Sequence, residues 1–256
     1  MLNPLAQELN ESLIGTSAEK LFSDLGKRIY FPRGIISQGA EAKKDAYTAN
    51  GTIGMTVIDG KPAILPSMQK YVPELKSSEV VAYAPTAGIP ELRNVWKEKL
   101  IQKNPSLKNK NFSLPILVPG LTAVLSYVAD LFVDVEKPLL APNPCWDNYE
   151  LIAAARRGAE FHMFQCFDEN GFSLSSLEKA MKEEAKKYGS VRVILNFPQN
   201  PSGYSPTVSE AKELVRIVKD VADSGAKVLV LCDDAYFGLN YEDDIESKSL
   251  FAKWRL

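Results

Sequence analysis

The second half of the chain repeats a pattern in which an amphipathic helix is followed by a short apolar strand. Leu174, Leu177 and Met181 recur at helical spacing, and Gly189 follows at a position where helices commonly end. Residues 191–195 are largely apolar, which indicates a buried strand. The pattern therefore predicts a helix that ends before Gly189 and a strand directly after it.

The same order returns in the next stretch of sequence. Thr207 and Glu210 have the spacing of a capping box, in which each side chain caps the backbone of the first helical turn. Gly225 then precedes the apolar run 227–231. We expect a helix that begins after Thr207 and a second buried strand over 227–231.

Weaker patterns extend this alternation toward the N-terminus. Helices are predicted over residues 90–103, over 122–133 and after Pro144, and strands over 114–118, 138–141 and 160–164. Helices that separate buried strands act as crossover connections between parallel strands. The chain is therefore predicted to be an α/β protein with a doubly wound, mostly parallel sheet.

Residues 1–62 are less regular than the rest of the chain. They show two short helical patterns, at 5–13 and 17–25, and a glycine-containing passage that ends at Gly54. We interpret residues 1–62 as an N-terminal arm with a segment of a small domain, and residues 63–256 as a large domain.

Charge and composition exclude several classes of protein. The 30 basic and 32 acidic residues give a net charge of -2, and no basic patch predicts contact with nucleic acid. No apolar run reaches the roughly 18 residues that a membrane helix needs, and the N-terminus lacks the pattern of a secretory signal. We therefore expect a cytoplasmic protein without nucleic-acid or membrane partners.

Cysteine and histidine offer little chemistry. Cys145, Cys166 and Cys232 are widely spaced and odd in number, which favours a reducing compartment over a disulfide framework. Spacing typical of a metal site is absent, so no metal is expected. His162, the single histidine, lies in an apolar run and is interpreted as a packed or surface strand residue rather than a catalytic base.

Candidate chemistry is concentrated just after the predicted strands, where doubly wound sheets bind ligands. Gly120 and Thr122 follow the first strand and could seat a phosphate at the start of a helix. Asn200 follows the strand that ends near residue 195, and Asp233 and Tyr236 follow the strand that ends near residue 231. Each segment has a simpler interpretation as a structural turn or, for the neighbouring acid at position 234, as a solvated loop residue.

Four ordered segments together resemble one family. Residues 196–203 are similar to its Asn-Pro-x-Asn-Pro-x-Gly signature, and residues 233–236 look like its Asp-x-Ala-Tyr element. Residues 142–149 resemble the stretch that carries the aromatic residue stacked on the cofactor, and residues 83–92 resemble a passage near the dimer interface. The family is that of the class I/II, fold-type I aminotransferases of the aspartate or aromatic type, which use pyridoxal 5′-phosphate.

The resemblance implies a role for each residue near the predicted strand ends. It places Gly120, Leu121 and Thr122 at the cofactor phosphate, Trp146 on the ring face, Asn200 and Tyr236 at the phenolic oxygen, and Asp233 at the pyridine nitrogen, with Asp233 and Tyr236 as catalytic residues. The large domain, residues 63–256, would then be the cofactor-binding domain.

The resemblance also implies substrates and a partner. Gly54, Trp146 and Asn200 would contact the substrate, although Gly54 could equally be a plain turn glycine. Tyr83 resembles a tyrosine that reaches the cofactor phosphate of a neighbouring subunit, which implies a homodimer with shared active sites. The substrates would be an amino acid, of the aspartate or aromatic class, and a 2-oxo acid.

The sequence departs from the family pattern in two respects. Tyr149 stands where aspartate aminotransferases often carry a histidine that supports the aspartate, so a tyrosine hydroxyl, or nothing, must do that work. The Schiff-base lysine and the carboxylate-binding arginine are not found; Lys248 and Lys253 lie too close to Asp233 and are interpreted as solvated. We therefore expect the 256 residues to be an inactive fragment of a longer enzyme, with a natural truncation as the alternative.

Other functions remain open at the level of sequence. The same fold supports other reactions of the cofactor, such as those of lyases and decarboxylases. A catalytically silent, aminotransferase-like binding domain is a third possibility, and it belongs to a different functional class.

Overall fold

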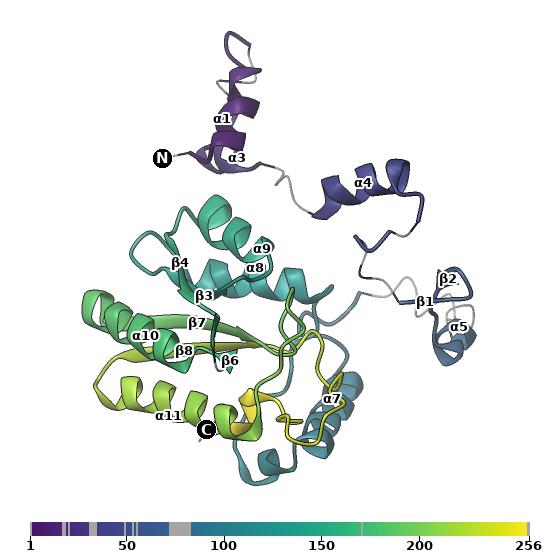
Figure 1. Ribbon diagram of the computed structural model, residues 1–256, viewed down its shortest axis with the longest axis vertical. Helices are drawn as coiled ribbons and strands as arrows, with labels where there is room; N and C mark the ends of the chain where they lie inside the picture. Colours follow the sequence, from purple (N-terminus) through teal and green to yellow (C-terminus); the bar gives the residue numbers. More distant parts are fainter. Residues whose placement is uncertain are drawn as a thin grey trace. The chain divides into compact units, whose positions relative to one another are not determined.

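The computed structural model describes residues 2–16, 19, 21–30, 35–48, 50–52, 54, 56–71, 83–169 and 171–254 (Figure 1). Contacts divide the chain into two compact units, one formed by Met1–Tyr30 with Ala87–Leu256 and the other by Phe31–Thr86. The contact boundaries fall at residues 30 and 86, whereas the expected domain boundary at residue 62 stays a prediction.

The larger unit is built on a four-stranded parallel sheet. Its strands are β3 (Leu139–Asn143), β4 (Phe161–Gln165), β7 (Ser190–Asn196) and β8 (Lys227–Asp233), in the order β4-β3-β7-β8. The register of β7 and β8 pairs Asn196 with Asp233 at the carboxyl end. Strands predicted over 138–141, 160–164, 191–195 and 227–231 are thus confirmed, each with a small shift in its bounds.

Helices cover both faces of this sheet. The helices α10 (Leu174–Tyr188) and α11 (Val208–Asp223) lie on one side, and α8 (Leu121–Phe132) and α9 (Asn148–Glu150) lie on the other (Figure 1). A π-helical turn, Leu151–Arg156, continues α9. Because every strand of the sheet is parallel and helices cover both faces, the doubly wound α/β prediction is confirmed.

Local sequence signals fix the ends of the two long helices. Gly189 ends α10 in the left-handed conformation, with φ of 65°, which a residue without a β-carbon adopts at little cost. At the start of α11 the Thr207 side chain accepts a hydrogen bond from the Glu210 N–H, and the Glu210 carboxylate accepts one from the Thr207 N–H. The predicted capping box is therefore present.

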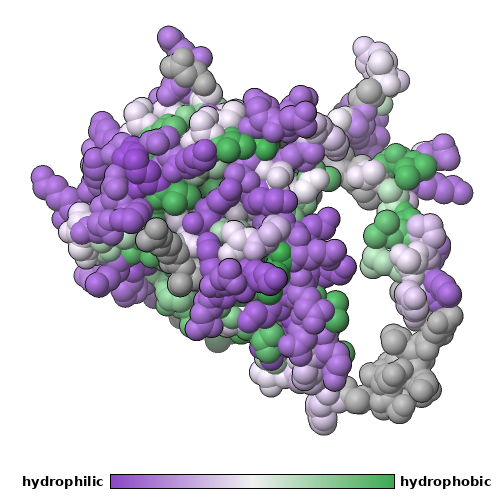
Figure 2. Space-filling view, turned by 90° about the horizontal axis from the view of Figure 1, so that it is seen from below, coloured by the Kyte–Doolittle hydropathy of each residue, from purple (hydrophilic) through white to green (hydrophobic). Residues whose placement is uncertain are grey.

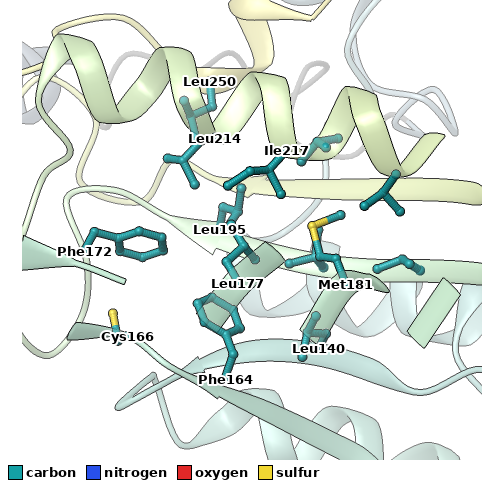
Figure 3. Close-up of a cluster of buried hydrophobic side chains, with 14 of the residues drawn as sticks. Leu140, Phe164, Cys166, Phe172, Leu177, Met181, Leu195, Leu214, Ile217 and Leu250 are labelled. Carbon is teal, nitrogen blue, oxygen red and sulfur yellow. The ribbon is translucent and has the colours of Figure 1, made fainter. Parts of the chain in front are cut away.

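Two apolar clusters pack against opposite faces of the sheet. Val193 belongs to the cluster that includes Leu177, Met181 and Leu214, shown in Figure 3, whereas its neighbour Ile194 belongs to the other cluster. Successive residues of a strand point to opposite faces. Burial on both sides explains why β7 is largely apolar instead of alternating between polar and apolar residues.

The prediction of a strand over residues 114–118 is wrong. No strand occurs between residues 110 and 118, because other groups bind the backbone there. The Leu117 N–H donates to the Ala87 carbonyl at 3.1 Å, and side chains of α7 (Pro90–Lys103) donate to the carbonyls of Phe112 and Pro115. Apolar character alone does not supply the neighbouring strand that a ladder needs.

The remaining elements are short. They are α1 (Pro4–Glu11), α3 (Asp24–Arg28), η2 (Pro105–Asn109), β5 (Phe167–Asp168), β6 (Gly171–Phe172) and η4 (Leu250–Lys253) in the larger unit, and α4 (Ile35–Asp45), β1 (Val57–Ile58), β2 (Lys61–Pro62) and α5 (Pro66–Tyr71) in the smaller one. The helix predicted over 5–13 corresponds to α1, and part of the helix predicted over 17–25 lies outside the described residues.

The coloured surface in Figure 2 is mostly hydrophilic, with scattered apolar patches. Within the part of the chain that the structure describes, no helix is both long enough and apolar enough to cross a membrane.

Candidate functional site

A pocket of about 230 Å³ opens where β7 and β8 end. Its walls are Leu121, Thr122, Leu125, Trp146, Tyr149, Asn196, Asn200, Asp233, Ala235 and Tyr236. The structure therefore brings together six of the predicted site residues, Leu121, Thr122, Trp146, Asn200, Asp233 and Tyr236. The pocket lies beyond the carboxyl ends of parallel strands, which is where ligands are expected to bind in such folds.

Asp233 is the buried charge of the pocket, with only 8% of its surface exposed. The Tyr149 hydroxyl donates to its Oδ2 at 2.6 Å, and the Ala235 N–H donates to its Oδ1 at 3.2 Å. Burial, and then the hydrogen bond to Asp233, raise the pKa of the Tyr149 hydroxyl far above its usual range, so it acts as a donor. A buried carboxylate favours a cationic partner, and none of the described residues lining the pocket is a lysine or arginine.

Asn196 joins the two strand ends that carry the site. Its Nδ2 donates to the Asp233 carbonyl at 2.8 Å, and its Oδ1 accepts from the Asn200 N–H at 2.8 Å. One buried amide thus positions both Asp233 and the turn that carries Asn200. Sequence reasoning missed this residue, although a polar side chain at the end of a buried strand is a usable signal.

Asn200 and Tyr236 are neighbours in the wall of the pocket. The Asn200 Nδ2 donates to the Tyr236 hydroxyl at 3.4 Å, and Tyr236 is 41% exposed. A hydrogen bond this long is weak, so both groups can turn to a ligand oxygen at little cost.

The first turn of α8 forms another wall. Gly120 precedes this helix with φ of 85°, no side chain caps its first turn, and that turn has no acidic residue. Leu121 and Thr122 line the pocket, whereas Gly120 is not among the residues that do. Unpaired N–H groups and the helix dipole make such a helix start favourable for an anion.

Trp146 supplies the aromatic wall. Its ring packs edge-on against Tyr149, with centroids 5.5 Å apart and planes at 88°. The turn that carries Trp146 is tied to the turn after β7, because the Gln199 Nε2 donates to the Pro144 carbonyl at 2.7 Å. Sequence reasoning gave Gln199 no role.

Two predicted residues lie in the smaller unit. Gly54 and Tyr83 are both exposed, and no atom lies within 4 Å of a β-carbon built on Gly54. Their roles at the substrate and at a neighbouring subunit stay predictions.

Two charged residues differ from the simplest interpretation of the sequence. Asp234 is not a solvated loop acid: it is half-buried, its Oδ2 accepts from the Ser249 hydroxyl at 2.6 Å, and burial raises the pKa of its carboxyl. Lys253 is not simply solvated either, because it pairs at 2.5 Å with the buried carboxylate of Glu246. Lys248 is exposed, as expected.

His162 lies on β4 and does not line the pocket. Its Nδ1 contacts Glu184 at 2.5 Å and its Nε2 contacts Glu160 at 2.9 Å. Among the residues that the structure describes, no group of three His, Cys, Asp or Glu side chains could hold a metal ion.

Comparisons with known proteins agree on one family. The model of aminotransferase class I and II matches residues 55–253. An aspartate aminotransferase of Pyrococcus abyssi is 27% identical over 180 residues, which are 69% of this chain and 43% of that protein. A probable aspartate/prephenate aminotransferase of Aquifex aeolicus is 29% identical over 163 residues, which are 63% of this chain and 38% of that protein. The chain thus spans less than half the length of these two relatives.

Solved structures show the same fold. An aminotransferase from Anaerococcus prevotii has a TM-score of 0.68 at 24% identity, over 80% of this chain and 51% of that one. An alanine aminotransferase from Pyrococcus furiosus has a TM-score of 0.68 at 18% identity, over 86% of this chain and 53% of that one.

Proposed function

The chain belongs to the class I and II aminotransferases, and we propose that its pocket binds pyridoxal 5′-phosphate to transfer amino groups between an amino acid and a 2-oxo acid. The observation that carries this proposal is the buried Asp233 carboxylate, which lies in one pocket with Trp146 and Asn200. When bound, the cofactor supplies an electron sink for a substrate bond that breaks at the α-carbon.

The residues of the pocket fit this cofactor. A volume of about 230 Å³ is slightly below the range of roughly 300–1,000 Å³ of pockets for drug-sized ligands, so a single substituted ring fits better than a dinucleotide. Asp233 is the only carboxylate that lines the described pocket, and a protonated ring nitrogen would provide the cation that it lacks. Tyr149 and the Ala235 N–H hold this carboxylate in one orientation.

The other walls match the remaining parts of the cofactor. Asn200 and Tyr236 can donate hydrogen bonds to the ring's phenolic oxygen, and Trp146 can cover a ring face. The start of α8, with Leu121 and Thr122, offers N–H groups to the phosphate. Gly120 would shape this turn through its positive φ.

The proton-transfer step needs a base that the described pocket does not contain. None of its lining residues is a lysine or a histidine. We therefore assign to the described residues the binding and orientation of the cofactor, and we assign the proton transfer to a group outside this set, in the complete protein.

The substrate class and the assembly belong to the same proposal. Relatives named as aspartate and aspartate/prephenate aminotransferases support aspartate as a donor, and an aromatic amino acid is the second donor class that we propose. We also propose a homodimer in which Tyr83 reaches the partner's cofactor phosphate.

A cytoplasmic location is supported by three cysteines that are all free in the structure.

Cofactor uptake by the chain tests the proposal. Pyridoxal 5′-phosphate should quench tryptophan fluorescence as it binds beside Trp146. The substitution Asp233→Ala should weaken its affinity about thirtyfold or more, because loss of one partner of a buried charge pair costs at least about 2 kcal/mol. Asp234→Asn is the matched control, since this neighbouring acid lines another cavity and should leave the affinity unchanged.

Two results would count against the proposal. If the unsubstituted chain takes up no cofactor, the assignment of the pocket fails. If Asp233→Ala binds as tightly as the unsubstituted chain, the pocket assignment survives and the role of Asp233 fails. The reaction itself is measured in the complete protein, with aspartate or an aromatic amino acid as donor and 2-oxoglutarate as acceptor.

A further inference from the structure

Gln199 connects two turns that each carry a wall of the pocket. The turn after β3 carries Trp146, and the turn after β7 carries Asn200. The Gln199 side chain does not line the pocket, yet only 3% of its surface is exposed. A buried amide must satisfy its donors and acceptors inside the protein, so its partners are informative.

The two ends of the Gln199 amide bind different turns. Its Nε2 donates to the Pro144 carbonyl at 2.7 Å, two residues before Trp146. Its Oε1 accepts from the Ser202 N–H at 2.9 Å and also from the Ser202 hydroxyl, two residues after Asn200. The side chain thus links its own turn to Pro144, which lies 55 positions earlier in the chain.

The backbone of Gln199 is held as well. Its N–H donates to the Tyr204 carbonyl at 2.8 Å, and its carbonyl accepts from the Gly203 N–H at 2.6 Å. The amide therefore extends from a fixed point of the turn after β7, and the donation to Pro144 is its one described link to the turn after β3.

We propose that Gln199 is a positioning residue that sets the distance between the Trp146 ring and the Asn200 amide, and so the width of the ring-binding slot. This inference rests on the proposed cofactor site for its functional meaning, but the coupling of the two turns is a property of the cofactor-free chain. Asn196 does the corresponding work between Asn200 and Asp233, so two buried amides join the segments that carry Trp146, Asn200 and Asp233.

Substitutions at Gln199 separate the two sets of hydrogen bonds. Gln199→Glu keeps an acceptor for Ser202 but loses the donor to Pro144. It places a carboxylate oxygen next to the Pro144 carbonyl oxygen, and the two repel each other. Gln199→Met keeps the approximate length of the side chain and removes both sets. Ser202→Ala is the matched control, because it removes the contacts of the hydroxyl with the Gln199 Oε1 and the Tyr204 N–H but leaves the link to Pro144.

The first measurement needs no cofactor. Chain labelled with 5-fluorotryptophan should give three ¹⁹F signals, for Trp96, Trp146 and Trp254, and Trp146→Phe identifies the relevant one. Gln199→Glu and Gln199→Met should shift or broaden the Trp146 signal alone, while Ser202→Ala leaves all three in place. An unchanged Trp146 signal in both folded Gln199 variants would overturn the proposed coupling.

The second measurement is the affinity for pyridoxal 5′-phosphate. Both Gln199 variants should bind it about three- to tenfold more weakly, the range expected for the net loss of one hydrogen bond, and Ser202→Ala should bind it normally. Equal affinities in all variants would contradict a role in the slot. Absence of binding by the unsubstituted chain would overturn the proposed function but not the coupling, which the fluorine signals report independently.

Discussion

At the scale of single residues, the site depends on a buried acid whose hydrogen-bond partners are all uncharged. Asp233 receives hydrogen bonds from Tyr149 and from the Ala235 N–H, and these orient the carboxylate without neutralising it. The sequence placed Asp233 at a strand end, but it left open whether Tyr149 supports this acid or does nothing. The 2.6 Å hydrogen bond between the two side chains answers that question. It could not be predicted from a local pattern, because it depends on the packing of α9 beside β8.

The Tyr149 hydroxyl should therefore contribute to stability. Tyr149→Phe leaves the buried Asp233 carboxylate without its closest donor, so we expect a loss of about 1.5–3 kcal/mol in the free energy of unfolding at pH 7. Tyr188→Phe is the control, because the Tyr188 hydroxyl binds the exposed Glu160 and its loss should matter little. Urea unfolding measures both variants, and equal stabilities would show that the Tyr149 contact contributes nothing.

At the scale of elements, patterns that are complete within one segment predicted the structure well. Gly189 ends α10, and Thr207 with Glu210 begins α11, as expected. The segment 114–118 failed because a strand requires a partner, and the partners of its backbone are Ala87 and side chains of α7. Local signals determine where a helix or strand begins and ends, whereas the pairing of a strand depends on residues elsewhere in the chain.

The capping box makes the local contribution measurable. Thr207→Ala removes the oxygen that accepts from the Glu210 N–H, and loss of such a cap costs about 1 kcal/mol of stability. Ser173→Ala is the counterpart, because Ser173 precedes α10 without a side-chain cap. Thermal or urea unfolding should separate the two variants, and a Thr207→Ala chain as stable as the original would disprove the contribution of this cap.

At the scale of the whole molecule, the parallel topology brings the site together. Strand ends that are remote in sequence meet at one edge of the sheet, which is why Trp146, Asn200 and Asp233 could be expected to converge from the sequence alone. The amides that fix their spacing, Asn196 and Gln199, could not be assigned in this way. Their partners become visible only when the turns lie next to each other.

The central claim is that the Asp233 carboxylate faces a protonated ring nitrogen in this pocket. The most direct measurement is the ¹⁵N chemical shift of pyridoxal 5′-phosphate labelled at the pyridine nitrogen, recorded when it is bound to the protein near pH 8. We predict the shift of a protonated nitrogen with the native sequence, and loss of that protonation when Asp233→Ala is saturated with the cofactor. A bound cofactor whose nitrogen is unprotonated, or whose shift ignores the substitution, would contradict the account.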